Sequence, residues 1–131
     1  MDFTNIVRYI LTGELLLGGQ ARITSTLTPS IHQRAMAKAD GYYKYLPIIP
    51  ASNPVQHSKI VGTLICTAGA LLAIPRDLGG RNVRLAGAGL SMSMSLMGVY
   101  SQARMGVSFI VPVINSILAG IIIWRELDKA D

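Results

Sequence analysis

The sequence predicts an all-α membrane protein, a four-helix transmembrane bundle with a short interfacial amphipathic helix between the first and second spans. Half of the 131 residues are hydrophobic, and the mean hydropathy is +0.42. The apolar residues form blocks: residues 60–74, 85–100 and 105–124 contain no charge, and a helix needs about 20 mainly apolar residues to cross a bilayer. A soluble domain with buried core helices is the alternative, but so short a chain leaves little to cover these blocks.

The first span is expected over residues 3–22. Glu14 interrupts its apolar run and no small-residue cleavage site follows, so the segment does not resemble a secretory signal. We therefore expect it to stay in the protein as a helix.

An amphipathic helix is expected over residues 30–45, directly after Pro29. One side would carry Ile31, Ala35 and Ala39, and the other side is polar. Tyrosines at positions 42, 43 and 45 suit a helix that lies in the membrane interface, where aromatic rings are favoured. Residues 46–54 contain three prolines, so no helix is expected there.

The remaining spans are expected over residues 56–75, 82–101 and 105–124, and residues 1–131 would form a single integral membrane domain. Residues 76–84, with two adjacent glycines, are expected to form a short basic turn. Each of these spans carries small residues at four-residue spacing, which lets helix backbones approach closely in lipid. These residues are Gly62, Cys66 and Ala70, then Gly87, Ser91 and Ser95, then Ser108, Pro112, Ser116 and Gly120.

The net charge of +5 comes from basic residues that lie mainly between the apolar blocks. They are expected to anchor the spans and to contact lipid headgroups, and nucleic acid is not an expected partner. The single cysteine, Cys66, excludes a disulfide within the chain. Neither His32 nor His57 has a partner at metal-ligand spacing, and no cofactor motif is present, so neither a metal nor a cofactor is expected.

Glu14 is the first candidate for a functional residue. A carboxylate in hydrocarbon is costly unless it is paired, hydrated or protonated, so such residues are rare and often functional. A carboxyl group shielded from water also favours its neutral form, which suits a general acid or base. We therefore expect Glu14 to be catalytic. The alternative is a structural hydrogen bond from a protonated Glu14 to a neighbouring helix.

Gln20 and Arg22, near the end of the first span, are expected to bind substrate. Arg22 lies on nearly the same helix face as Glu14, eight residues away, which is about 12 Å along the axis. Direct pairing is therefore not expected. Gly18 would leave space between the two side chains for a substrate or for water.

Asn115 and Tyr100 are expected to act with Glu14 as catalytic residues. Pro112 cannot donate a backbone hydrogen bond, so it should kink the last span and free a carbonyl group near Asn115. Tyr100 is followed by Gln102 and Arg104, which are expected to bind substrate. The structural alternatives are a packing kink with Asn115 bonded across helices, and interfacial anchoring by the group around Tyr100.

The chain resembles the DoxX-like family of small four-helix membrane proteins over roughly residues 6–124. Residues 13–24, 42–47 and 61–72 carry the resemblance, which is strongest to the branch that includes the acetylcholine-receptor assembly chaperone. That family often places a glutamate in the second helix, three residues after the equivalent of Gly62. This chain has Ile65 there, so a function that depends on that carboxylate is not expected.

The resemblance implies several functions, among them subunits of quinone-linked oxidation systems and receptor-assembly factors. Fungal natural-product pathways also use very small polytopic proteins as epoxide hydrolases and cyclases. We expect a membrane-embedded enzyme that acts by acid–base chemistry on a lipophilic small molecule, of the epoxide hydrolase, cyclase or isomerase type. Whether the chain is an enzyme stays open, because a non-catalytic assembly factor or subunit of a larger membrane complex is the alternative.

The partners expected are the lipid bilayer and either a lipophilic small molecule or another membrane protein. Self-association into a homo-oligomer is left open. The expected location is a membrane that the chain crosses several times, an endomembrane if the source is eukaryotic.

Overall fold

The computed structural model describes residues 3–128, and in that range the secondary structure consists of helices joined by loops, with no strand. It has six helices: α1 (Phe3–Ile23), α2 (Pro29–Ala37), α3 (Ala39–Tyr45), α4 (Pro54–Ala73), α5 (Arg76–Met105) and α6 (Ile110–Asp128). The all-α prediction is therefore confirmed. The prolines of residues 46–53 keep that segment non-helical, as expected.

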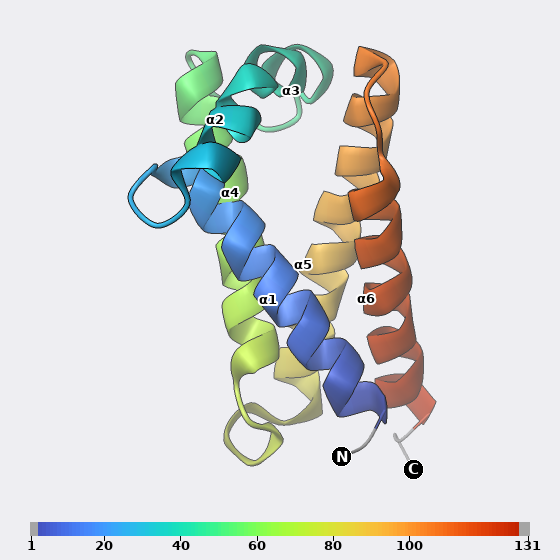
Figure 1. Ribbon diagram of the computed structural model, residues 1–131. Helices are drawn as coiled ribbons and strands as arrows, with labels where there is room; N and C mark the ends of the chain where they lie inside the picture. Colours follow the sequence, from blue (N-terminus) through green and yellow to red (C-terminus); the bar gives the residue numbers. More distant parts are fainter. Residues whose placement is uncertain (1–2, 129–131) are drawn as a thin grey trace.

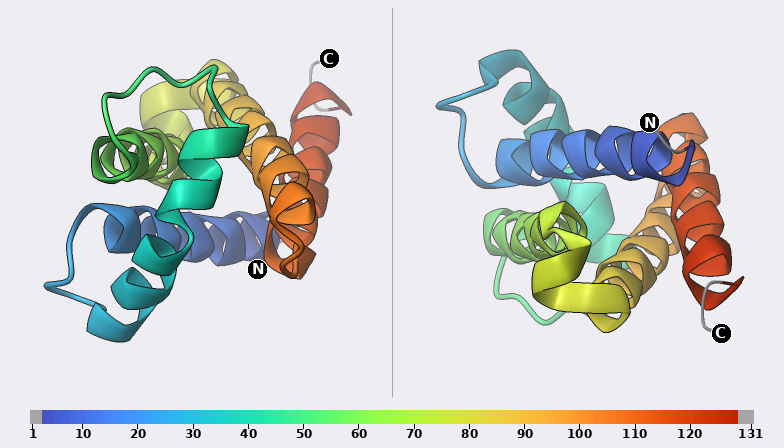
Figure 2. Two further views of the ribbon diagram at one scale, coloured as in Figure 1. Left: turned by 90° about the horizontal axis from the view of Figure 1, so that it is seen from above. Right: turned by 90° about the horizontal axis from the view of Figure 1, so that it is seen from below.

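Four long helices run alternately up and down, and two short helices lie across one end (Figure 1). We call α2 and α3 the roof, and the opposite end, where both chain termini lie, the base (Figure 1). Seen from above, the roof crosses over the space that the four long helices surround (Figure 2). The core inside the bundle consists of aliphatic side chains from all four long helices, including Leu11, Leu15, Leu72, Ala88 and Ile122.

The closest helix contact is the crossing of α1 and α4 near the roof. Gly19 and Gly62 face each other there, and a Cβ atom added to Gly62 would lie 2.6 Å from the carbonyl oxygen of Gly19. The same crossing leaves room for Cys66, which packs against Gly19. Because the backbones touch at this point, α1 crosses the bundle diagonally, from beside α6 at the base to α4 at the roof (Figure 1). Gly62 and Cys66 thus lie at the helix contact, as their four-residue spacing predicted. Ala70, the third small residue of that series, is exposed.

The amphipathic segment predicted as one helix over residues 30–45 is two helices. The chain leaves helical hydrogen bonding at Lys38, which ends α2 and precedes α3. Gly41 lies in α3 where Met105 of α5 packs against its backbone. The bend lets the roof follow the end of the bundle, whereas a straight helix of that length would project beyond it.

The basic turn expected over residues 76–84 is also mostly helical. The chain resumes helical geometry at Arg76 and is interrupted only at Gly80, whose φ of 68° is a left-handed conformation that glycine adopts readily. The third long helix therefore begins earlier than residue 82 and continues past residue 101, to Met105.

The predicted start of the fourth span at residue 105 and its proline kink are both wrong. Gly106, with φ of 73°, ends α5, and α6 begins only at Ile110. Pro112 consequently lies in the first turn of α6, where a missing N–H costs little because first-turn N–H groups have no partner in the helix. No carbonyl group is freed by a kink, since Ser108 lies outside the helix.

The residues that follow the last predicted span, which ends at residue 124, continue α6 to Asp128, and this end of the helix reaches the core. Glu126 is fully buried, and its carboxylate lies 3.4 Å from the guanidinium of the buried Arg84 on α5. Arg8 of α1 is also buried at the base, and it donates a 2.7 Å hydrogen bond to the carbonyl of Leu72 in the last turn of α4. That carbonyl has no partner within its own helix, so charged groups tie the helix ends together at the base.

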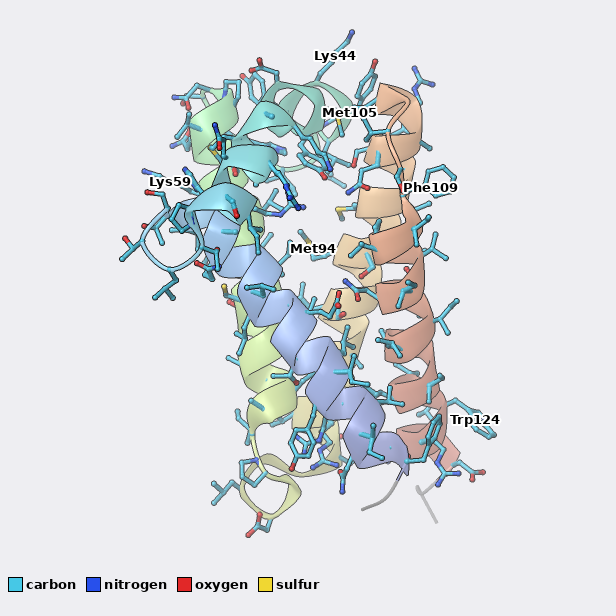
Figure 3. The ribbon with its side chains drawn as sticks, in the orientation of Figure 1. Lys44, Lys59, Met94, Met105, Phe109 and Trp124 are labelled. Carbon is cyan, nitrogen blue, oxygen red and sulfur yellow. The ribbon has the colours of Figure 1, made fainter. Side chains whose placement is uncertain are left out.

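Large apolar side chains remain exposed on all four long helices. They are Phe3, Ile6, Tyr9, Ile10, Leu16 and Leu17 on α1, Val55 on α4, Leu78, Leu96 and Tyr100 on α5, and Ile110, Val111, Ile114, Ile117, Trp124 and Leu127 on α6. Phe109 and Trp124, at the two ends of α6, point outward (Figure 3). In the described part of the chain, α6 is the one helix long and apolar enough to cross a membrane by length and composition. The other three predicted spans contain charges or many glycines and serines.

Substituting Gly62 with alanine should destabilise the protein. The added Cβ would meet the Gly19 backbone, which cannot move aside as a flexible side chain would. Overpacking of this kind costs about 1–3 kcal/mol. A lower midpoint of thermal unfolding, followed by helical circular dichroism of the purified protein, checks this expectation.

The matched control is Gly89→Ala on α5, where an added Cβ meets nothing within 4 Å. Alanine favours a helix interior over glycine by up to about 1 kcal/mol, so this variant should unfold at the same or a higher temperature. Equal shifts for the two variants would contradict a close α1–α4 crossing.

Candidate functional site

A cavity of about 390 Å³ lies beneath the roof, among α1, α5 and α6. Glu14 from α1, Val111 from α6 and Arg34 from α2 line it and are also exposed, so it reaches the surface between these helices. Met94 points from α5 into the space between α5 and α1 (Figure 3). The lining comes from all six helices and the α5–α6 connection: Glu14, Leu15, Gly18, Arg22, Ile31, Arg34, Ala35, Lys38, Tyr42, Ile65, Met94, Ser95, Gly98, Gln102, Ser108, Val111, Pro112 and Asn115.

Four of the seven residues predicted for the site line this cavity: Glu14, Arg22, Gln102 and Asn115. They are far apart in the sequence and come from three different long helices. On α1, Gly18 lies between Glu14 and Arg22, and a Cβ added to it would meet nothing within 4 Å. The open space expected beside Gly18 is therefore part of the cavity.

The other three predicted residues lie outside the cavity lining. Gln20 donates to the carbonyl of Leu17 and to the hydroxyl of Thr28, which ties α1 to the segment before α2. Tyr100 is about half exposed, at 52%. Arg104 is exposed and lies over the ring of Tyr45, with 5.4 Å between the guanidinium carbon and the ring centre. The structure does not bring these three side chains together with Glu14.

A hydrogen-bonded group forms the roof end of the cavity around the Tyr42 hydroxyl. Gln102, buried on α5, donates its side-chain N–H to this oxygen at 2.7 Å. Arg22 donates to the same oxygen at 3.5 Å, and its guanidinium carbon lies 4.6 Å from the centre of the Tyr42 ring. Because the hydroxyl oxygen accepts from both neighbours, its own proton is available to a ligand.

Two further cations, Arg34 of α2 and Lys38 between α2 and α3, line the cavity near this group. Within residues 3–128, the side chains of Arg34 and Lys38 make no hydrogen bond or ion pair. Arg22 uses a guanidinium N–H for Tyr42 and has others to spare. Three positive side chains therefore face one end of the cavity, and the only carboxylate in the lining is Glu14.

The other end of the cavity holds Glu14 and Asn115. Glu14 makes no ion pair with any described residue, and Asn115 has a buried side-chain oxygen without a hydrogen-bond partner in the described chain. Ser95 of α5 also lines the cavity. Apolar side chains separate this end from the cationic end, among them Ile65 and Met94. A carboxyl group and an amide are thus available to a molecule held between apolar walls.

Hydrogen bonds to helix-end carbonyls fasten the roof above the cavity. His32 of α2 lies 2.7 Å from the Ala21 carbonyl at the end of α1, and His57 of α4 lies 3.0 Å from the Leu46 carbonyl after α3. Ser58 donates to the Arg22 carbonyl at 2.9 Å. These carbonyls belong to helix ends, which lack partners in their own helix. Both histidines therefore have structural contacts, and no three metal-ligating side chains gather among the described residues.

Sequence reasoning missed Arg34, Lys38 and Tyr42 as parts of the site. It placed the polar face of residues 30–45 against lipid headgroups, because amphipathic periodicity shows that a face is polar but not what it faces. The length of the segment between the first two long helices could have indicated this arrangement, because the segment is long enough to fold back over the end of the bundle.

The chain was compared with protein families, with characterised proteins and with solved structures, and none of them matches it.

Replacing Tyr42 by phenylalanine should lower stability. The change removes the oxygen that accepts from the buried Gln102 amide, and a buried donor left without a partner costs about 1–3 kcal/mol. Thermal unfolding of Tyr42→Phe should therefore show a lower midpoint than the wild type.

Tyr45→Phe is the matched control, since the Tyr45 hydroxyl makes no hydrogen bond to any described residue while its ring contacts Lys44 and Arg104. Its unfolding midpoint should be unchanged. A Tyr42→Phe variant as stable as this control would show that the Gln102–Tyr42 bond does not hold the roof.

Proposed function

We propose that the protein is an integral membrane protein whose four long helices cross a bilayer and whose cavity holds a lipophilic small molecule for acid–base chemistry at Glu14. The observation that carries the proposal is the cavity of about 390 Å³ that joins Glu14 and Asn115 across apolar walls. Ligand sites commonly have volumes of about 300–1,000 Å³, mainly apolar linings and a few polar groups.

The apolar exposed surface supports the membrane part of the proposal. Contiguous exposed apolar side chains on a water-soluble monomer are unfavourable, whereas lipid tails cover them at no cost. The exposed apolar residues of α1 and α6 form such surfaces. The DoxX-like resemblance of residues 6–124 agrees with a four-span arrangement and is part of the same proposal.

Segregation of charge to the two ends of the bundle also supports a four-span arrangement. On α5, residues 85–103 carry no charge, and Arg84 and Arg104 flank this segment. Twenty residues of helix correspond to about 30 Å, which is the thickness of the hydrocarbon core of a bilayer. Lys44 and Lys59 point outward at the roof end (Figure 3), where headgroups would lie.

Glu14 is suited to open an epoxide or a similar strained oxygen ring. In this reaction the protonated carboxyl group gives its proton to the ring oxygen as the C–O bond breaks, and water or an internal hydroxyl forms the new bond at carbon. The attacking oxygen then loses a proton, which restores the Glu14 acid. Water addition gives a diol, and an internal hydroxyl gives a cyclic ether. The Asn115 side-chain oxygen, which has no protein partner, would accept a hydrogen bond from the attacking group.

A non-catalytic assembly factor is the second candidate, because another membrane protein would cover the exposed faces of α1 and α6 as well as lipid does. Purification from native membranes separates the two candidates. A stoichiometric polytopic partner supports the assembly factor, and a co-purified lipophilic metabolite supports the enzyme.

Cysteine labelling should place the roof and the base on opposite sides of a membrane. Ser30 and Asp77 are exposed at the two ends of the bundle, so Ser30→Cys and Asp77→Cys are made separately in a Cys66→Ala background. In sealed native vesicles, a membrane-impermeant maleimide should label only one of the two variants. Permeabilised vesicles should label both, and equal labelling of both in sealed vesicles would contradict four spans.

Glu14→Gln should abolish turnover while leaving the fold intact, because general acid–base catalysis contributes about 10²–10⁴ in rate. The protein in lipid nanodiscs is supplied with a panel of long-chain and terpenoid epoxides. Diol and cyclic-ether products are measured by mass spectrometry in ¹⁸O-labelled water. The wild type should convert at least one class, and Glu14→Gln should be slower by about 100-fold or more.

The matched control is Asp40→Asn, which makes the same carboxylate-to-amide change on the exposed side of α3, outside the cavity. It should retain full activity. Full activity in Glu14→Gln would exclude the acid–base role, and conversion lost equally in both variants would point to a general effect of charge.

A further inference from the structure

We infer that the ligand of the cavity is an amphipathic carboxylic acid, whose carboxylate binds the cationic roof end and whose apolar body extends toward Glu14. This inference rests on the proposed function, since it names the chemistry of the molecule that the same cavity would hold. Its basis is the unequal distribution of charge along the cavity.

The roof end of the cavity is built to bind an anion. Arg22, Arg34 and Lys38 all line it, and in the described chain none of them has a carboxylate partner. Like charges that face one cavity repel each other unless an anion compensates them. The Arg22 guanidinium carbon lies 4.6 Å from the centre of the Tyr42 ring, and one of its N–H groups donates to the Tyr42 hydroxyl, so its position is restricted before a ligand arrives. A planar fork of this kind matches a carboxylate.

Neutral donors complete the same end. The Tyr42 hydroxyl accepts from Gln102 and Arg22, which leaves its proton to donate to an anionic oxygen. Gln102 is buried and fixes the position of that hydroxyl. A carboxylate would therefore meet both charged and neutral donors, and hydrogen bonds to a charged acceptor are the stronger kind.

The apolar body of the ligand has its own place in the cavity. Glu14 precedes Arg22 by eight residues on α1, and Met94 precedes Gln102 by eight residues on α5. Both spacings correspond to about 12 Å along the helix axes. Leu15, Ile65 and Met94 line the intervening length and offer no hydrogen bonds. A molecule anchored by its carboxylate would thus present an atom about 12 Å away to Glu14 and Asn115.

The charge at each end also argues against the reverse orientation. A carboxylate held at the Glu14 end would meet no cation, because Arg22, Arg34 and Lys38 line the roof end. In addition, the opening between α1 and α6 carries apolar side chains such as Val111, which suit the tail of an amphiphile. A ligand without charge would leave the three cations uncompensated.

The experiment uses photo-crosslinking of the full chain in nanodiscs of zwitterionic phosphatidylcholine. The probe is hexadecanoic acid with a diazirine in its chain, and the comparison probe is its methyl ester. Crosslinked peptides are identified by mass spectrometry. The acid should label cavity residues of α1 or α5 about tenfold more efficiently than the ester, a ratio that corresponds to about one charge-assisted hydrogen bond.

Arg34→Gln/Lys38→Gln is the test variant, because Arg34 is exposed on α2 and Lys38, between α2 and α3, is only partly buried, so their loss should not disturb the core. Labelling of the cavity by the acid should fall about tenfold. Lys44→Gln/Lys59→Gln, which removes two charges at the same end but outside the cavity, is the control and should label like the wild type.

Four results would overturn the inference. Equal labelling of the cavity by acid and ester would show that the cavity binds lipophilic molecules whether or not they carry a carboxylate. The inference would then be wrong, and the proposed function would be unaffected. An equal fall of acid labelling in both double variants would show that the cations act only by general attraction of the anion to this end of the protein. The unlabelled competitors oleate and lysophosphatidic acid are added to the labelling reaction with the acid probe. If lysophosphatidic acid reduces labelling of the cavity more than oleate does, the roof end binds a phosphate group and not a carboxylate. Labelling of no cavity residue by either probe would remove the proposed function as well.

Discussion

The contact between Gly19 and Gly62 is the constraint on which the shape of the molecule depends. Helices that pack closely through small residues cross at an angle, and α1 leans away from α6 as it rises toward its contact with α4 at the roof (Figure 1). The lean opens the bundle on one side only. Glu14, Gly18 and Arg22 then follow one another at four-residue steps along the face of α1 that borders this opening. The close packing of the two glycines thus determines which side chains of α1 line the cavity.

The roof converts that opening into a cavity with unlike ends. Without α2 and α3, the upper part of the opening would be filled by solvent or lipid. With them, Arg34, Lys38 and Tyr42 face the long helices and lie over an apolar interior. Charges beside a region of low polarity act over longer distances than charges in water. The roof therefore supplies most of the electrostatic character of the cavity, while the long helices supply its walls.

The all-α class, the four long helices and several cavity-lining residues were predictable from the sequence, but the geometry of the helix ends was not. Apolar blocks predict long helices well because a charge-free run of this length must be covered by something. The bend at Lys38 and the late start of α6 depend on packing against Met105 and on the left-handed Gly106, which periodicity does not reveal. Glu14 and Arg22 were found because charges stand out in an apolar run. Glu126 was missed because it follows the apolar block and looks like part of a polar tail.

The Arg84–Glu126 ion pair has a consequence for the order in which the chain is made. The two residues are 42 positions apart, and synthesis at about 5–20 residues per second separates their appearance by about 2 to 8 seconds. During that interval Arg84 must keep water or another acceptor around it, because a buried cation without an anion is strongly unfavourable. The first half of α5 therefore cannot settle until α6 has been synthesised. The last helix is a prerequisite for the packing of the one before it, and a ribosome that stopped before Glu126 would release a bundle unable to close at its base.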